Sequence, residues 1–305
     1  MIEIAIVLTR LLQYVGAAIL FGSSLFFVYA LPASRPPVLW LRPLLVGSAL
    51  LLITATLAGL LAQTAAMAGG WSESVKSEAL TAVVTQMDLG KAAIARASLG
   101  VIALALLVTC RPSRGLWVTA ALVGGIATVT FAWMGHGAAT EGDGHFLHLV
   151  ADTVHSLAAA LWIGALCGFL VLMSGRSTDR HAVLDLHDAL KQFSSLGTVL
   201  VIALIGTGMI NSWFLVGLDF RVAISTPYGQ MLALKLLLFG GMLVLAMVHR
   251  FRLVPALSRQ VEDRIVHEAA TMSTLRRTVS IEAALGFGIM AVVAWMGTLA
   301  PPALQ

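Results

Sequence analysis

Residues 147–173 read LHLVADTVHSLAAALWIGALCGFLVLM, and this stretch decides the fold class. An α-helix needs about 20 mainly apolar residues to cross the hydrocarbon core of a bilayer, and the stretch exceeds that length. It shows no alternation of apolar and polar side chains with period two, which a strand of a membrane β-barrel would require. We therefore interpret residues 147–173 as a membrane-spanning helix.

Seven further segments have the same character. They lie at about residues 4–31, 43–66, 91–110, 116–135, 194–217, 229–249 and 277–299. Each is Leu, Ala and Gly rich and long enough to span a bilayer. The predicted fold class is therefore all-α, a polytopic membrane protein with eight transmembrane helices.

The composition supports the same class of protein. Of 305 residues, 59% are hydrophobic and 11% are charged, whereas a soluble domain has about 45 to 50% apolar and about 25% charged residues. Charges this sparse cannot cover the surface of a water-soluble fold. The formal net charge of +4 reflects basic residues in the loops rather than a nucleic-acid partner. The chain contains no Walker loop, dinucleotide fingerprint or nucleophile elbow, and we expect no enzyme activity.

The basic residues in the loops predict the orientation. One set of alternate loops carries only three basic residues, Lys76, Lys91 and Arg221. Thirteen lie in the other set: Arg35, Arg42, Arg111, Arg114, Arg176, Arg180, Lys191, Arg250, Arg252, Arg259, Arg264, Arg276 and Arg277. By the positive-inside rule the basic loops face the cytoplasm, and an even number of spans then places both termini outside.

The two halves of the chain resemble each other. Three patterns recur in order: Arg10, Gln13 and Gly22 match Asp152, His155 and Gly164; Gly90 and Arg96 match Gly229 and Lys235; Trp133-Met134 matches Trp295-Met296. Four spans per half would make the repeats parallel, related by an axis along the membrane normal. We therefore expect an N-terminal four-helix half, residues 1–140, and a C-terminal four-helix half, residues 141–305.

Metal-ligand side chains concentrate around the start of the fifth span. His136, His145, His148, Asp152 and His155 lie within twenty residues, and the last three share one face of a helix. His148 and His155 are about 10.5 Å apart along the axis, too far for one ion with metal–nitrogen bonds of about 2 Å. The pattern predicts a ladder of ligands that descends from the outer surface. Imidazole and carboxylate suit divalent copper, zinc, nickel or iron, and Met134 or Met209 could add sulfur for monovalent copper.

Other polar side chains lie within the spans. Arg10, Gln13, Asn211, Lys235 and Glu282 are costly in lipid, so we expect them to face the bundle interior. For Lys235 and Arg96 we favour a different interpretation, in which the side chain extends toward the outer surface. Glu282 could pair with Arg276 and Arg277. Cys167 is interpreted as a packing residue.

The motifs resemble those of the copper resistance protein D family, CopD and PcoD. The resemblance rests on the run from His148 to Gly164 and on four further motifs: Gly135-His136, Thr226-Pro-Tyr-Gly229 with Lys235, Arg250-Phe-Arg-Leu-Val-Pro255, and Arg276-Arg277 through Glu282. It implies an eight-helix bacterial inner-membrane protein that moves copper from the periplasm inward, beside a periplasmic copper-binding partner of the CopC type. By this resemblance His136, His148, Asp152 and His155 meet the metal. Gln13 stands where such proteins are expected to have a histidine, and His145 lies outside the pattern.

Two functions from different classes follow. The first is copper transport, in which protons compete with the metal for imidazole and carboxylate, so that uptake weakens below about pH 6. The alternative is a b-type haem protein that passes electrons across the membrane. Haem would require two histidines on facing helices at one depth, whereas the candidates crowd at one end and His249 lies alone at the other.

Overall fold

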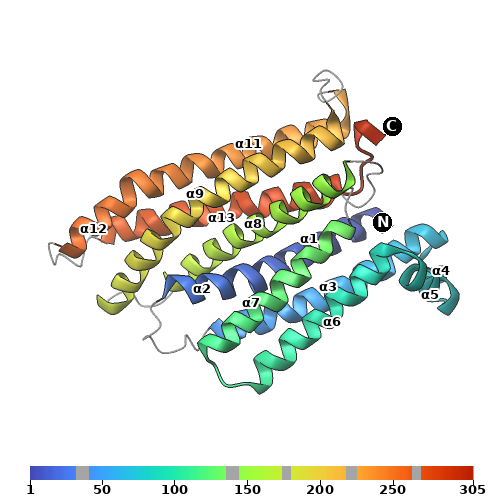
Figure 1. Ribbon diagram of the computed structural model, residues 1–305, viewed down its shortest axis with the longest axis horizontal. Helices are drawn as coiled ribbons and strands as arrows, with labels where there is room; N and C mark the ends of the chain where they lie inside the picture. The colour runs from blue at the N-terminus through green and yellow to red at the C-terminus, as the bar shows by residue number, and fades with distance from the viewer. Residues whose placement is uncertain (32–40, 135–143, 174–179, 218–224, 263–268, 305) are drawn as a thin grey trace.

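The protein is a helical bundle elongated along its helix axes (Figure 1). This computed structural model describes residues 1–31, 41–134, 144–173, 180–217, 225–262 and 269–304. Eight helices within those ranges are long and apolar enough to cross a membrane, which confirms the eight predicted spans: Ile2–Ala30, Leu41–Ala68, Asp88–Thr109, Arg114–Trp133, His145–Leu172, Leu184–Val216, Pro227–Arg259 and Met272–Met296.

The helical elements follow one another with short connections. In chain order they are α1 (Ile2–Ala18), η1 (Ile19–Ser23), α2 (Ser24–Ala30), α3 (Leu41–Ala68), α4 (Trp71–Ser74), α5 (Ser77–Gln86), α6 (Asp88–Thr109), α7 (Arg114–Val129), η2 (Thr130–Trp133), α8 (His145–Leu172), α9 (Arg180–Val216), α11 (Pro227–Val248), η4 (His249–Leu253), α12 (Val254–Glu262), α13 (Ala269–Met296) and η5 (Pro302–Leu304). Both termini lie at one end of the bundle, which we call the terminal end, and α12 lies at the other, the α12 end (Figure 1).

The outward surface of the bundle is apolar. Large hydrophobic side chains are exposed along its helices, among them Leu122, Val199, Ile202 and Leu237. Every backbone group within an α-helix bonds inside its own segment, so such a surface can face lipid without unpaired polar groups. Buried Leu, Phe and Ala side chains from both halves form the main core.

The two halves meet where α1 and η1 pack against α8. Gly22 in η1 faces Gly164 in α8, and a Cβ atom on either glycine would collide with the backbone of the opposite helix. The Ser23 hydroxyl donates a hydrogen bond of 2.8 Å to the Gly164 carbonyl at the same crossing. Gly22 and Gly164 are equivalent positions in the predicted repeats. A two-fold axis that relates two repeats brings equivalent positions together where it passes between them. The division into two repeats stays a prediction.

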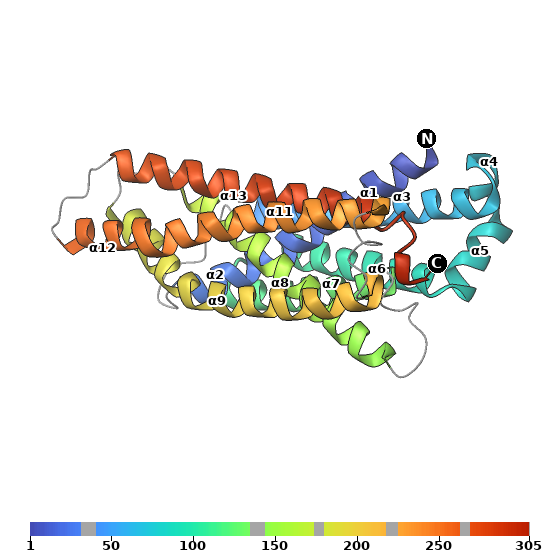
Figure 2. The same cartoon turned by 90° about the horizontal axis from the view of Figure 1, so that it is seen from above.

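Three details differ from the sequence-based expectation. The sixth span belongs to α9, which begins at Arg180, well before residue 194. The seventh span, expected to end near residue 249, continues from α11 through the π-helical turn η4 into α12 (Figure 2). The short helices α4 and α5 lie at the terminal end between the second and third spans (Figure 2).

Candidate metal-binding cavity

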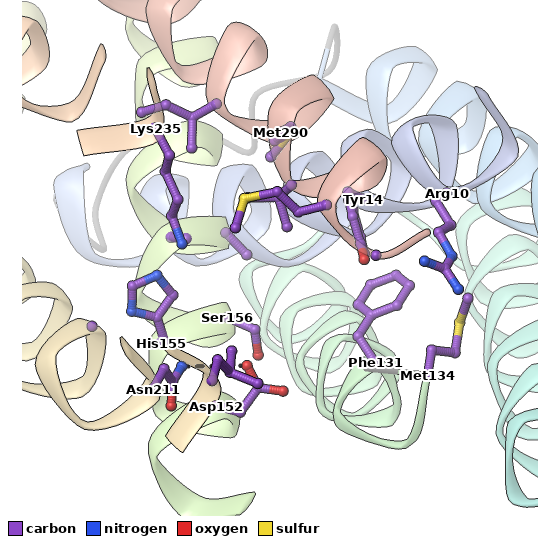
Figure 3. A pocket seen from close by; sticks show the side chains of 18 of the residues that line it. Arg10, Tyr14, Phe131, Met134, Asp152, His155, Ser156, Asn211, Lys235 and Met290 are labelled. Carbon is purple, nitrogen blue, oxygen red and sulfur yellow. Dashed lines mark hydrogen bonds between the residues drawn. The ribbon is translucent and has the colours of Figure 1, made fainter. Parts of the chain in front are cut away.

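A cavity of about 240 Å³ lies between the two halves. Most of its polar lining comes from four spans: Arg10 and Tyr14 from α1, His148, Asp152, His155 and Ser156 from α8, Asn211 and Ser212 from α9, and Tyr228 and Lys235 from α11 (Figure 3). Thr128 of α7 adds a hydroxyl group from a fifth span. These positions lie in the half of the bundle nearer the terminal end. The sequence predicts His148, Asp152 and His155 on one helical face, and the structure brings all three to one cavity.

His148 is held by aromatic stacking in the first turns of α8. Its ring lies parallel to that of Phe214 from α9, with 4.8 Å between the ring centroids and 7° between the planes. Only 1% of the residue is exposed. Gly144, just before α8, leaves the space that the Phe214 ring occupies, because a Cβ atom there would lie 2.5 Å from its Cε1. The stacking fixes the orientation of the His148 imidazole at the edge of the cavity.

Asp152 shares the cavity with an amide and an ammonium group. Asn211 Nδ2 donates a hydrogen bond of 3.4 Å to Asp152 Oδ1. Lys235 from α11 lines the same cavity. The prediction that Asn211 faces the bundle interior is therefore correct. The favoured extension of Lys235 toward the outer surface is wrong, because its side chain lines the internal cavity. The carboxylate keeps oxygen lone pairs that a metal ion could use.

His155 has a defined tautomer. Its Nδ1 lies 3.0 Å from the hydroxyl oxygen of Thr207 on α9. That hydroxyl donates its own proton to the Ala203 carbonyl, at 2.6 Å, and therefore accepts from the imidazole. Nδ1 then carries the hydrogen, and Nε2 keeps the lone pair with which histidine binds metals. In Figure 3 the Lys235 side chain extends toward this ring.

The ladder does not close into a single site within the described ranges. No three of the His, Cys, Asp and Glu side chains described lie close enough together to hold one metal ion. His136, the fourth predicted ligand, lies outside the described residues. His145 is the first residue of α8 and is not among the residues that line the cavity. The ligand roles of His136, His148, Asp152 and His155 stay predictions.

Thioethers from both halves join the imidazoles and the carboxylate. Met134, Met290 and Met296 line the cavity. Met209 does not line it and is 68% exposed, so the prediction that Met209 could supply sulfur is wrong. Met296 is the repeat equivalent of Met134. That correspondence was the one signal in the sequence that could have indicated Met296 as a cavity residue. Nothing in the sequence distinguished Met290 from a packing residue.

Arg96, in the first half, is the repeat equivalent of Lys235. Its guanidinium is fully buried and donates to Gln13 Oε1 and to Met134 Sδ, both at 2.7 Å. It also donates to the Thr130 hydroxyl at 2.9 Å and to the Thr130 carbonyl at 3.1 Å, and it lies over the Phe131 ring. The prediction that the Arg96 side chain extends toward the outer surface is therefore wrong. Gln13 accepts a hydrogen bond from this cation, whereas its repeat equivalent His155 faces the cavity.

Two further residues depart from simple expectation. The Arg10 side chain reaches the cavity as predicted, but its Nε is buried without a hydrogen-bond partner among the described residues. Glu282 forms no ion pair with Arg276 or Arg277 there, contrary to the prediction. It accepts a hydrogen bond of 2.8 Å from the Trp162 indole and lies beside His249.

Eight spans and an internal cavity lined by imidazole, carboxylate and thioether groups define a class, the multi-pass membrane proteins that handle a metal ion. Residues 1–146 match the family model described as copper resistance protein D-like, N-terminal domain, and residues 187–296 match that described as copper resistance protein D. The chain belongs to the copper resistance protein D family.

Three curated relatives extend this result. The copper resistance protein D of Pseudomonas syringae pv. tomato is 33% identical over 299 residues, which cover 96% of this chain and 95% of the relative. The inner membrane protein YebZ of Escherichia coli is 32% identical over 57% of this chain and 56% of its own length. The copper transport protein CutJ of Bacillus subtilis is 25% identical over 96% of this chain and 52% of its own length. No solved structure matches the chain significantly.

Proposed function

We propose that the protein transports copper ions across a bacterial inner membrane, from the periplasm to the cytoplasm. The observation that carries this proposal is the convergence of His148, Asp152 and His155 on one cavity between the halves. Family membership supports copper as the cargo, and two relatives are named for copper resistance and copper transport.

The lining of the cavity suits copper in either oxidation state. Imidazole nitrogen and carboxylate oxygen are ligands for the divalent ion, and thioether sulfur favours the monovalent ion. His155 Nε2 carries a lone pair because Thr207 accepts the hydrogen of Nδ1. His136 would complete the upper rung of the ladder nearest the periplasm.

The cations in the cavity suit a cargo that must leave again. Arg10 and Lys235 line the same space as the candidate ligands. Their positive charge lowers the affinity for a metal cation, because like charges repel strongly where little water screens them. Binding strong enough for entry and weak enough for release is what a transport site needs.

The direction of transport rests on charge placement. The thirteen basic loop residues support a cytoplasmic α12 end, and the shared location of the termini fits an even number of spans (Figure 1). The cavity then opens nearer the periplasm, where a copper-binding partner of the CopC type could deliver the ion. The chain itself carries no nucleotide-binding motif, so the energy source would be a gradient or another protein.

The cavity favours copper transport over the haem alternative. A b-type haem needs histidines on two facing helices. Among the described histidines, the two that line the cavity, His148 and His155, both come from α8. His249 lies at the α12 end, where it contacts Thr278 and Glu282.

Copper accumulation in cells tests the proposal. Cells that express His148→Ala or His155→Ala should accumulate no more copper than cells with the empty vector. Met209→Ala, at an exposed position away from the cavity, is the matched control and should retain wild-type uptake. Equal membrane levels of each variant, measured by immunoblot, exclude loss of the protein. Wild-type uptake by both histidine variants would overturn the proposal, and a Soret band in the purified protein would favour haem.

A further inference from the structure

A second cavity, of about 340 Å³, lies toward the α12 end of the C-terminal half. It is lined by side chains from four spans, among them Trp162 of α8, Thr198 of α9, Met247 of α11 and Glu282 of α13. His249 and Arg250 from the turn η4 border it as well. None of these residues lines the first cavity.

Two metal-ligating side chains meet at its wall. His249 Nδ1 lies 3.0 Å from Glu282 Oε2. Glu282 is 1% exposed, and its other oxygen, Oε1, accepts the hydrogen bond from Trp162. Apart from this contact with His249, Oε2 is buried without a hydrogen-bond partner among the described residues. A carboxylate oxygen in this state is costly unless a cation or a donor compensates it.

The hydrogen bonds of Thr278 determine the tautomer of His249. The Thr278 hydroxyl donates to the Thr274 and Leu275 carbonyls, both at 3.0 Å. It must therefore accept from His249 Nε2, which lies 2.8 Å away. In a neutral imidazole Nδ1 then carries a lone pair. Two electron-pair donors, Nδ1 and Oε2, thus lie side by side, an arrangement that a shared cation stabilises.

The local backbone places this pair beside the cavity. His249 is the first residue of the π-helical turn η4, which links α11 to α12. π-helical turns of this kind occur frequently at functional sites. The neighbouring Arg250 guanidinium is bonded to Thr198 and to the Ser194 carbonyl of α9. These two neutral oxygens hold the guanidinium against α9.

The two cavities are stacked along the same helices. On α8, His155 and Trp162 are seven residues or about 10.5 Å apart, and on α13, Met290 and Glu282 are separated by about 12 Å. On α13, Gly286 lies between these two positions, and the apolar side chains of Ile163 from α8 and Met242 from α11 pack against it to form an apolar layer. A Cβ atom on Gly286 would overlap Ile163 Cδ1 and lie 3.5 Å from Met242 Cε. Two polar stations are thus separated by one thin apolar barrier.

We propose that His249 Nδ1 and Glu282 Oε2 form a second copper-binding station, on the α12 side of this barrier. The inference rests on the proposed function, because it assigns to the pair the ion that the first cavity would release. The Met247 thioether borders the same cavity and offers a soft third ligand. A copper ion would cross the layer of Ile163, Met242 and Gly286 between the two stations.

Copper binding to the purified full-length protein in lipid nanodiscs tests the second station. Equilibrium dialysis against a buffered copper salt, followed by metal analysis, gives the number of ions per chain. Glu282→Gln keeps the acceptor for the Trp162 indole and removes the charge. We expect this variant to bind one copper ion fewer than wild type, or to bind the last ion at least about tenfold more weakly. His249→Asn, a second variant, should behave in the same way.

His155→Ala, in the first cavity, separates the two proposals. If His155→Ala loses copper and both variants at the second station bind like wild type, the second station is refuted and the proposed function stands. If the variants at the second station lose an ion and His155→Ala does not, the second station stands and the role of the first cavity fails. A pair that held only a proton would leave the copper count unchanged in Glu282→Gln, and that result would also overturn the proposal.

Discussion

Gly22 of η1 and Gly164 of α8 are packed backbone against backbone where the two halves cross. No side chain fits between them, because a Cβ atom on either residue would overlap the other helix. The contact is reinforced by the hydrogen bond from the Ser23 hydroxyl to the Gly164 carbonyl. The first cavity is lined by residues of α1 and α8 on the terminal side of this crossing.

Substitution of Gly164 by alanine should therefore destabilise the bundle. The added methyl group must push α8 away from η1, and overpacking of this kind costs about 1 to 3 kcal/mol. Thermal unfolding of the purified protein in detergent measures the effect. Gly206→Ala in α9 is the matched control, because nothing lies within 4 Å of a Cβ atom there. Equal melting temperatures for the two variants would contradict the close contact.

Thr207 should act as a positioning residue for His155. Thr207→Val removes the acceptor that directs the hydrogen to Nδ1, so Nε2 is no longer held as the free ligand atom. Loss of such a partner typically weakens metal binding by about 10- to 100-fold. Copper affinity of the purified protein, measured by competition with a chelator, gives the change. Thr207→Ser retains the hydroxyl and should restore wild-type affinity, a rescue that a purely steric role would not require.

Arg96 should be essential for the stability of the first half. Arg96→Lys replaces a guanidinium group, which donates hydrogen bonds to Gln13, Met134 and Thr130, with a single ammonium group. Each buried acceptor left unpaired costs about 1 to 3 kcal/mol, so we expect a clear loss of thermal stability. Lys91→Ala removes an exposed ion pair with Asp88 and serves as the comparison. That variant should change stability by less than about 1 kcal/mol, and a similar result for Arg96→Lys would contradict the role of the network.

Copper uptake should depend on the external pH. His148 and His155 bind a metal as neutral imidazoles and Asp152 as a carboxylate, so each proton that binds displaces the ion. Because protons compete with the metal for these ligands, we expect uptake to fall as the pH drops below about 6. Initial rates of copper uptake between about pH 5 and 7.5, at constant free copper, measure this dependence. A rate that stays constant across that range would argue against ligands of this type.

The sequence predicted more of the fold than of the site. The apolar stretch 147–173 and its seven counterparts were sufficient to identify eight spans, because the thickness of a bilayer sets the length of each helix. The length of α9 and the continuation of α11 into α12 were missed. Polar residues at the α12 end continue these helices beyond the apolar stretch, and hydropathy does not report them.

The shared face of His148, Asp152 and His155 could also be predicted, because residues three and four apart on a helix are neighbours. The partners of these residues could not. Thr207, Phe214 and Asn211 all come from α9, and which of its faces meets α8 depends on packing between the helices. The wrong pairing of Glu282 with Arg276 and Arg277 has the same origin. Proximity in sequence suggested it, whereas the structure brings Trp162 and His249 to the carboxylate.

By itself the sequence determined the class of protein, the number of spans and the helix that carries the candidate ligands. These properties are local, since they depend on hydrophobicity over one segment and on the spacing of residues along one helix. The tertiary structure alone decided that Arg96 is satisfied inside the first half, that Met290 joins the first cavity, and that His249 meets Glu282. Those relations are contacts between helices, and they arise from how the helices pack against one another in space.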